Sequence, residues 1–305
     1  MNTRLEGIIT PMITPLQADG TLDCVGLQKQ IDRLLHAGIA GIFVLGTTGE
    51  GPALGRSLQQ QMIRESVKII AGRAPLLAGI SAAAPDDSVE LGLFAKQVGA
   101  DAVVAAPPCY LPADDRELET FYRRLTSETG IPLYLYNMPA MTKINMSPEL
   151  IIRLASIPGI VGYKDSAGDL TAFLRVLAAL KDRRDFSVLM GPDMLMTEAV
   201  RHGAQGGVNG GSNLCPELFV TAYRAARRGD AAAVARLQSK IEMVQKVYGF
   251  RSHICCGVIV GLKAGLQHLG VCGVAEAWPA RPAEPEVIAQ VAAITQTLQS
   301  ESYTD

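Results

Sequence analysis

Lys164 is the residue of this chain whose position most clearly indicates chemistry. It closes an apolar run, residues 159–163, and a polar turn at residues 165–169 follows it directly. Burial disfavours the ammonium form of a lysine, and an uncharged amine can attack a carbonyl carbon to form a Schiff base. Strand-terminal lysines also often only extend into solvent, so the position alone leaves both roles open.

A tyrosine and two threonines occupy comparable places in the chain. Tyr136 ends an apolar run, and residues 46–51 read Gly-Thr-Thr-Gly-Glu-Gly after another. A phenol beside a forming carbinolamine can shuttle protons, whereas a lone tyrosine at a strand end is usually a packing residue. Backbone N–H groups of a small-residue turn, with the hydroxyls of Thr47 and Thr48, can hold a carboxylate. An ordinary turn would explain the glycines but not the paired threonines.

A glycine-rich segment, residues 206–213, follows the last apolar run of strand length. Such segments often receive phosphate, but this one has no Walker lysine and no clear phosphate pattern at a helix start. The segment therefore favours a substrate that carries a carboxylate or hydroxyl groups.

These residues must be positioned by the elements that precede them. Apolar runs of strand length alternate with segments of helical period up to residue 228, which is typical of a parallel α/β fold. Eight such repeats in about 230 residues predict a (β/α)8 TIM barrel, and an open doubly wound sheet is the alternative. The predicted strands are 7–13, 41–45, 76–80, 102–105, 133–136, 160–164, 187–190 and 206–208. The predicted helices are 25–37, 58–71, 87–98, 117–129, 148–155, 170–180, 195–202 and 216–228, with Ser147 and either Asp86 or Asp87 as caps.

After residue 228 the strand pattern stops. The sequence predicts a barrel at residues 1–228 and a C-terminal helical region at residues 229–305, with helices at 231–247, 255–269 and 285–299. This region carries no chemical motif of its own, and Gly261 and Gly265 are expected to be packing residues. We expect it to pack as a cap on the barrel or on another subunit.

Composition excludes several classes of function. With 48% hydrophobic and 19% charged residues and a formal net charge of -2, the chain is expected to be a soluble protein that binds neither nucleic acid nor a membrane. The first residues lack the apolar region of a signal peptide, and no run of about 18 apolar residues predicts a membrane helix, so the expected compartment is the cytoplasm.

Cysteines and histidines give no sign of a metal site. The six cysteines are scattered without Cys-x-x-Cys spacing and are expected to be reduced. The four histidines, His36, His202, His253 and His268, fall in or beside predicted helices rather than in a cluster with carboxylates. A catalytic zinc site needs several converging ligands, so none is expected.

Taken together, the three strand-end motifs resemble those of the dihydrodipicolinate synthase and N-acetylneuraminate lyase superfamily, the class I pyruvate-dependent aldolases. The resemblance rests on residues 46–50, 136–139 and 162–165, in the family's order and spacing, and it extends through the whole barrel.

The resemblance implies a role for six residues. Lys164 would form the Schiff base with pyruvate or another 2-oxo acid, Tyr136 would donate and accept protons, and Thr47 would join Tyr136 in a relay. Thr48 would hold the pyruvate carboxylate, and Val208 aligns with a position whose backbone contacts pyruvate. Tyr110 aligns with a tyrosine that enters the relay from a neighbouring subunit. The resemblance further implies a homotetramer and no cofactor beyond the imine itself.

One departure from the family separates two functional hypotheses. Dihydrodipicolinate synthases commonly carry an arginine two residues after the proline of the tyrosine motif, where this chain has Met141. Methionine cannot replace the bidentate guanidinium clamp, and nearby Lys143 is a poor geometric substitute. The leading hypothesis is therefore a lyase that cleaves or forms a 4-hydroxy-2-oxo acid, such as a 2-keto-3-deoxy sugar acid. The alternatives are dihydrodipicolinate synthase itself and a non-catalytic protein that binds a 2-oxo acid.

Overall fold

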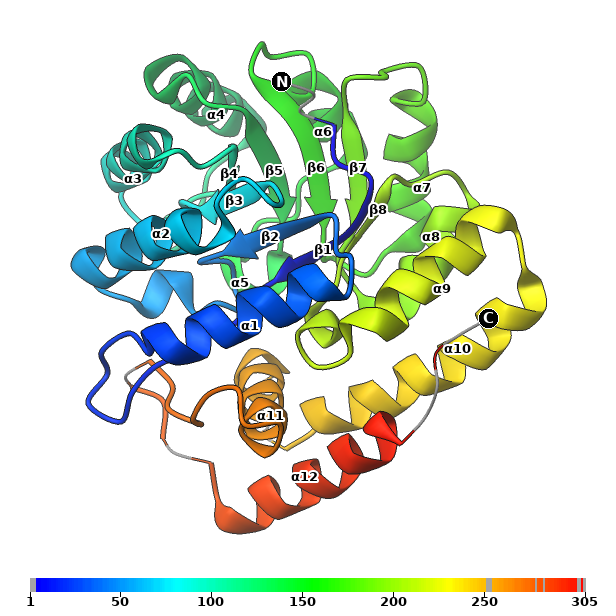
Figure 1. Cartoon of the computed structure of the whole chain (residues 1–305). Helices are drawn as coiled ribbons and strands as arrows, with labels where there is room; N and C mark the ends of the chain where they lie inside the picture. Colours follow the sequence, from blue (N-terminus) through cyan, green and yellow to red (C-terminus); the bar gives the residue numbers. More distant parts are fainter. Residues whose placement is uncertain (1–3, 251–253, 278, 282, 301–302, 304–305) are drawn as a thin grey trace.

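The fold is a closed barrel of parallel strands surrounded by helices (Figure 1). The computed structural model describes residues 4–250, 254–277, 279–281, 283–300 and 303. Its strands pair in chain order, and β1 closes the barrel by pairing with both β2 and β8. They are β1 (Gly7–Pro11), β2 (Gly41–Val44), β3 (Leu76–Gly79), β4 (Ala102–Ala105), β5 (Leu133–Asn137), β6 (Ile160–Asp165), β7 (Ser187–Met190) and β8 (Gly206–Val208). The predicted TIM barrel is confirmed.

The first strand is shorter than predicted. It ends at Pro11, and the N–H of Met12 still donates to the Phe43 carbonyl of β2 at 2.8 Å. Beyond it, the N–H of Ile13 donates to the side-chain oxygen of Asn213 at 3.0 Å, which ties the end of β1 to the segment after β8.

Helices join consecutive strands and cover the outside of the barrel (Figure 1). They are α1 (Cys24–His36), α2 (Arg56–Ile70), α3 (Pro85–Val98), α4 (Asp115–Thr129), α6 (Pro148–Leu154), α7 (Leu170–Ala179), α8 (Met196–Arg201) and α9 (Pro216–Arg228). The sequence pattern did not predict four short pieces, which follow β2, β5, β7 and β8: η1 (Gly51–Ala53), α5 (Pro139–Thr142), η2 (Asp193–Leu195) and η3 (Gly210–Asn213).

One predicted cap is confirmed and one is wrong. The Ser147 side chain accepts from the N–H of Leu150 at the start of α6. Helix α3, however, begins at Pro85, and Asp86 and Asp87 lie in its first turn instead of before it. Proline suits the first helical position, because its φ is fixed near the helical value and its missing N–H would have no partner there.

The strands separate two apolar cores, because alternate side chains point to opposite faces. One set packs between the strands and the outer helices, as Ile42, Val103 and Leu135 do. The other fills the barrel interior and comprises Leu5, Ile9, Phe43, Leu77, Ala102, Val104, Ala106, Tyr134, Tyr136, Leu189 and Val208. A side chain that points inward from the end of a strand therefore lies at the top of the interior core.

The C-terminal region begins where α9 ends, at Gly229. Its helices are α10 (Ala231–Gln245), the short η4 (Lys246–Tyr248), α11 (Ile254–His268) and α12 (Pro285–Gln299). Helix α10 packs on α9, and α12 lies against α10 and α11 (Figure 1). Gly261 is a packing residue, since a Cβ there would lie 1.7 Å from the carbonyl oxygen of Val247.

Candidate active site

Lys164 points into the barrel because of an irregularity in β6. Leu133 pairs with Ile160, but the next residue of β5, Tyr134, pairs with Gly162, so Val161 is an extra residue. One inserted residue moves every later side chain of the strand to the opposite face of the sheet. Gly162 accommodates this, since a Cβ there would lie 2.1 Å from the Tyr134 ring. Lys164 then pairs with Tyr136, an interior residue, and its side chain points inward.

The Lys164 amine is surrounded by aromatic faces. Its Nζ lies 3.9 Å from the ring centroid of Tyr136 and 5.2 Å from that of Phe43. Lys164 is 5% exposed, and its Nζ forms no hydrogen bond or ion pair with any residue that the structure describes. A buried amine without a fixed anion beside it is free to react with a carbonyl carbon that enters the site.

The Tyr136 hydroxyl reaches the first threonine of the turn after β2. The two oxygen atoms, Tyr136 Oη and Thr47 Oγ1, are 3.2 Å apart, and either can donate. Since the Tyr136 ring also contacts the amine of Lys164, one phenol connects the amine with the threonine hydroxyl. The predicted proximity of Thr47, Tyr136 and Lys164 is therefore observed, and the 3.2 Å contact is suitable for moving a proton between the phenol and the threonine hydroxyl.

The threonine turn, residues 46–51, is held in a conformation that few side chains adopt. Leu45, directly before residues 46–51, has φ +60°, and Glu50 within them has φ +58°, both in the left-handed region. The turn is closed by hydrogen bonds from the N–H of Glu50 to the Thr47 carbonyl, 3.1 Å, and from the N–H of Gly51 to the carbonyl of Gly46, 3.1 Å. Backbone strain of this kind persists where the surrounding structure fixes it, and it is frequent at functional sites.

The predicted residues line one cavity of about 250 Å³ at the carboxyl ends of the strands. Thr47, Thr48, Tyr136, Lys164 and Val208 all contribute to its wall. Tyr110 does not line it: this side chain is 94% exposed and has φ +82°. The structure thus brings together five of the six residues and leaves Tyr110 on the surface.

Other parts of the cavity wall were not predicted from the sequence. Asp193, at the start of η2, also lines the cavity. So do four residues of the C-terminal region: Gln245, Tyr248, Val258 and Ile259. The C-terminal region, which carries no chemical motif of its own, thus supplies part of the cavity wall. An acidic residue just beyond a strand was a signal available for Asp193, but no pattern in the sequence marks the tail residues.

Asp193 is a buried carboxyl with several donors. Its Oδ2 accepts from the N–H of Gly211 at 3.0 Å, from Gln245 at 3.0 Å and from the Tyr248 hydroxyl at 2.8 Å. Although these bonds favour the carboxylate, burial outweighs them and raises the pKa of Asp193 to about 6. The group thereby links η2, η3 and the C-terminal region at the cavity wall.

The raised pKa predicts how stability changes with pH. Between the usual value of 3.8 and about 6 the folded protein binds more protons at Asp193 than the unfolded chain does. The free energy of unfolding should therefore fall as pH rises through this window, by up to about 1.4 kcal/mol per pH unit. Asp193→Asn should remove that contribution. Urea unfolding of both proteins between about pH 4 and 7 tests this, and equal pH slopes would contradict it.

A second polar network lies where β5 and β6 end, next to Tyr136 and Lys164. Asp165 Oδ1 accepts from the Tyr163 hydroxyl at 2.6 Å and from the Asn137 amide at 3.1 Å, and Asn137 Oδ1 accepts from the N–H of Met146 at 3.1 Å. Burial raises the pKa of the Asp165 carboxyl. Because Asn137 and Asp165 directly follow Tyr136 and Lys164, this network fixes the strand ends that carry them.

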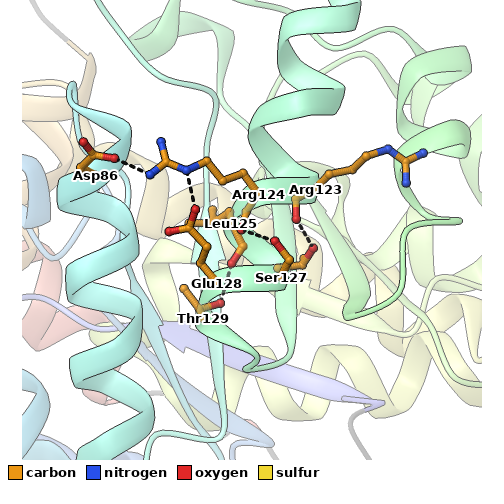
Figure 2. Close-up of polar contacts among 8 residues, drawn as sticks. Asp86, Arg123, Arg124, Leu125, Ser127, Glu128 and Thr129 are labelled. Carbon is orange, nitrogen blue, oxygen red and sulfur yellow. Dashed lines mark hydrogen bonds and ion pairs between the residues drawn. The ribbon is translucent and has the colours of Figure 1, made fainter.

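A larger hollow, of about 900 Å³, lies at the opposite end of the barrel and is not the candidate site. It is lined by α4 and by the segments that lead into β5 and β6. Figure 2 shows one of its arginines, Arg124, already bound by Glu128 at 2.6 Å and by Asp86 at 2.7 Å. Another, Arg123, is bound by Glu119 at 2.7 Å. The guanidinium groups of both arginines are thus already in ion pairs, and the strand-end motifs lie at the other end of the barrel.

The described residues contain neither a metal-ligand cluster nor a membrane-spanning helix. Within them, no three His, Cys, Asp or Glu side chains are grouped so that they could hold a metal ion. His253, one of the histidines considered above, lies outside the described residues. No described helix is long and apolar enough to span a membrane.

Comparisons with known proteins identify the family. The family model for the dihydrodipicolinate synthetase family matches residues 4–298. The chain belongs to this family. It is 33% identical to a probable 2-dehydro-3-deoxy-D-pentonate aldolase of Escherichia coli, YjhH, over 82% of this chain and 83% of that one.

Solved structures of family members have the same fold. Dihydrodipicolinate synthase from Bacteroides thetaiotaomicron superimposes with a TM-score of 0.93, at 42% identity over 97% of this chain and 100% of that one. YagE, a prophage protein of the family from E. coli solved in complex with pyruvate, gives 0.90 at 28% identity over 96% and 98%. The predicted superfamily is confirmed, and with it the class of Schiff-base lyases and aldolases.

Met141, where synthases of the family commonly carry arginine, lies outside the described cavity wall. It is 44% exposed. The Lys143 amine donates to the carbonyl of Ala140 at 2.8 Å, on the surface. Among the described residues that line the cavity, Lys164 is the one cation. The expectation that Lys143 does not substitute for the arginine agrees with this geometry.

Proposed function

We propose that this protein is a pyruvate-dependent lyase that cleaves or forms a 4-hydroxy-2-oxo acid of the 2-keto-3-deoxy sugar acid class. The observation that carries the proposal is the inward-facing Lys164 amine, 3.9 Å from the Tyr136 ring, in the same cavity as Thr47 and Thr48. The wall of that cavity offers a carboxyl, an amide and a phenol, from Asp193, Gln245 and Tyr248. Such groups suit the hydroxyls of a sugar acid better than a second carboxylate.

In the cleavage direction, the Lys164 amine attacks the C2 keto carbon of the substrate. Tyr136 passes a proton to the departing oxygen as the carbinolamine loses water, and Thr47 carries protons to and from the phenol. Deprotonation of the C4 hydroxyl then breaks the C3–C4 bond: C4 leaves as the carbonyl carbon of an aldehyde, and the protonated imine accepts the electron pair as an enamine. Protonation at C3 and hydrolysis release pyruvate and restore the amine.

The remaining predicted residues hold the substrate in place. The proposal assigns the carboxylate next to C2 to the hydroxyl and N–H of Thr48, with the backbone of Val208 on the other side of the pyruvate moiety. Both residues line the cavity beside Lys164. The imine of Lys164 serves as the electron sink, so the proposed reaction needs no separate cofactor.

Tyr110 is proposed to act across a subunit interface. Because this tyrosine is 94% exposed in the single chain, it is available to enter the relay of a neighbouring subunit in a homotetramer. A cytoplasmic site of action is supported by Cys24, Cys109, Cys215 and Cys272, which are all free thiols.

The imine provides a direct test. The protein is incubated with pyruvate and borohydride, and the reduced adduct is mapped by mass spectrometry. The proposal expects a single modified peptide containing Lys164, and an unmodified Lys164 peptide would refute it. A screen of 2-keto-3-deoxy acids for pyruvate release then identifies the substrate. Stabilisation by a 2-oxo acid without a trapped imine would instead support the non-catalytic binding protein.

Dihydrodipicolinate synthase remains a second candidate for one specific reason. The chain is 42% identical to the synthase of B. thetaiotaomicron over 97% of its length. That reading expects turnover of pyruvate with aspartate semialdehyde, which the same screen can include.

Met141→Arg tests whether the missing guanidinium decides between the two reactions. The substitution restores a bidentate carboxylate clamp at the position where synthases commonly have one. We expect turnover with aspartate semialdehyde to rise about tenfold or more, since a charge-assisted hydrogen bond contributes 1.5 kcal/mol or more. Met141→Gln, which is similar in length but uncharged, is the control. Equal turnover in the two variants would contradict the assignment.

A further inference from the structure

The carboxylate of Glu50 connects the threonine turn to the C-terminal region. Glu50 Oε1 is paired with the Lys263 amine on α11, and Glu50 Oε2 accepts from the N–H of Ala277 at 2.6 Å. Lys263 also donates to the carbonyl of Ala275 at 2.6 Å. The side chains of Lys263 and Glu50 are 0% and 5% exposed. Two buried charges are thus matched by each other and by two backbone groups.

The position of Glu50 in the turn makes this pair relevant to the site. Glu50 follows Thr47 and Thr48 by three and two residues, and its own backbone has the left-handed φ of +58°. Glutamate rarely adopts this conformation, because its Cβ approaches the backbone. A carboxylate anchored at both oxygens holds the backbone there, and the hydrogen bond from the N–H of Glu50 to the carbonyl of Thr47 passes the constraint to the threonines.

The position of Lys263 ties the same turn to the opposite wall of the cavity. Lys263 lies one helical turn beyond Ile259 on α11, and Val258 and Ile259 line the cavity together with Thr47 and Thr48. The ion pair therefore fixes two walls of one cavity relative to each other, although its partners are 213 residues apart in the chain.

We infer that Glu50 and Lys263 are positioning residues for the pyruvate carboxylate: their buried pair sets the hydroxyl and N–H of Thr48 at the distance from Lys164 that a bound 2-oxo acid requires. The C-terminal region is in this respect part of the binding site. The inference rests on the proposed function and deepens it, since it states what determines affinity for the common part of every substrate.

The first test replaces both partners, because a single change would leave one charge buried and unpaired. The double variant Glu50→Gln/Lys263→Met removes both charges of the pair, so no unpaired charge is left buried. The fraction of Lys164 trapped by borohydride is then measured against pyruvate concentration. The half-saturating concentration should rise about tenfold or more, as expected when an interaction that binds substrate is lost. A folded double variant within about twofold of the wild type would overturn the inference.

A control and a second variant separate positioning from stability. Leu154→Ala removes a fully buried side chain of α6, away from the cavity, so it should lower the melting temperature but keep the wild-type half-saturation. Glu50→Asp keeps the charge but is one methylene too short to reach both Lys263 and the N–H of Ala277. If the double variant does not fold, Glu50→Asp carries the same expectation and the same refutation.

A cycle with Thr48 shows whether the pair acts through the threonine. Thr48→Val alone should raise the half-saturating pyruvate concentration, and adding it to the double variant should raise it little further. If the two changes instead raise the half-saturating pyruvate concentration independently, so that their factors multiply, action through Thr48 is refuted.

The proposed function and the inference can fail separately. If wild-type Lys164 is not trapped at any pyruvate concentration, the Schiff-base function is refuted. The wild type and the double variant are then compared by how much pyruvate raises the melting temperature of each. If pyruvate stabilises the wild type but not the double variant, the inference holds. A wild type that is neither trapped nor stabilised overturns both.

Discussion

Lys164→Met is expected to abolish imine trapping and to lower kcat/KM by about four to six orders of magnitude, because the residue that would form the covalent bond is removed. The folded state should survive the change. Methionine is close to lysine in length and packs well against aromatic rings such as those of Phe43 and Tyr136. The variant also removes a buried polar group that has no hydrogen-bond partner among the described residues, so its melting temperature should equal or exceed that of the wild type.

Lys143→Gln is the matched control for this experiment. Lys143 follows the neighbouring strand β5, its amine is exposed, and it donates to a backbone carbonyl rather than facing the cavity. We expect this variant to keep both trapping and turnover. Residual trapping in Lys164→Met that disappears when Lys143 is also replaced would show that the assignment of the nucleophile is wrong.

Tyr136→Phe should lower kcat by about two to four orders of magnitude, the usual contribution of a general acid and base. The ring would stay against Lys164, so the aromatic contact survives while the hydroxyl that lies 3.2 Å from Thr47 is lost. Imine formation should become slow but should still reach a Lys164 adduct after long incubation. Single-turnover measurements separate this slow step from substrate binding.

Tyr134→Phe provides the comparison within the same strand. Tyr134 also points into the barrel, two residues before Tyr136, but it does not line the cavity, and burial raises the pKa of its phenol to about 12. Removal of its hydroxyl should reduce stability by about 1 kcal/mol and leave kcat near the wild-type value. Equal losses of kcat in both variants would indicate disturbed packing and would argue against a proton relay.

Together, these variants test the two halves of the proposed mechanism. Lys164 governs whether a covalent intermediate forms, and Tyr136 governs how fast protons move around it. Neither is expected to distinguish the synthase from the sugar-acid lyase, because both reactions begin with the same imine. That distinction depends on Met141 and on the tail residues of the cavity wall.

Much of the fold could be predicted from the sequence for a simple physical reason. In a barrel both faces of every strand are buried, so the strands appear as short apolar runs, and the helices between them carry the amphipathic period. The predicted strands 102–105, 187–190 and 206–208 coincide with β4, β7 and β8. Short pieces such as α5 were missed, because four residues are too few to show a period.

The sequence by itself determined which residues could react and at which end of the barrel they lie. Lys164, Tyr136 and the two threonines each follow an apolar run, and the carboxyl ends of parallel strands converge on one face. The family resemblance added their roles, and the comparisons confirmed the family. These conclusions need only local pattern and chain order.

Only the tertiary structure decided which way Lys164 points and what encloses the site. The extra residue in β6 reverses the alternation, and it is detectable only in the pairing of β6 with β5. The contacts of Glu50 with Lys263, and of Asp193 with Tyr248, join segments that are far apart in the chain. Such contacts depend on how the C-terminal helices pack on the barrel, and no local pattern in the sequence encodes that packing.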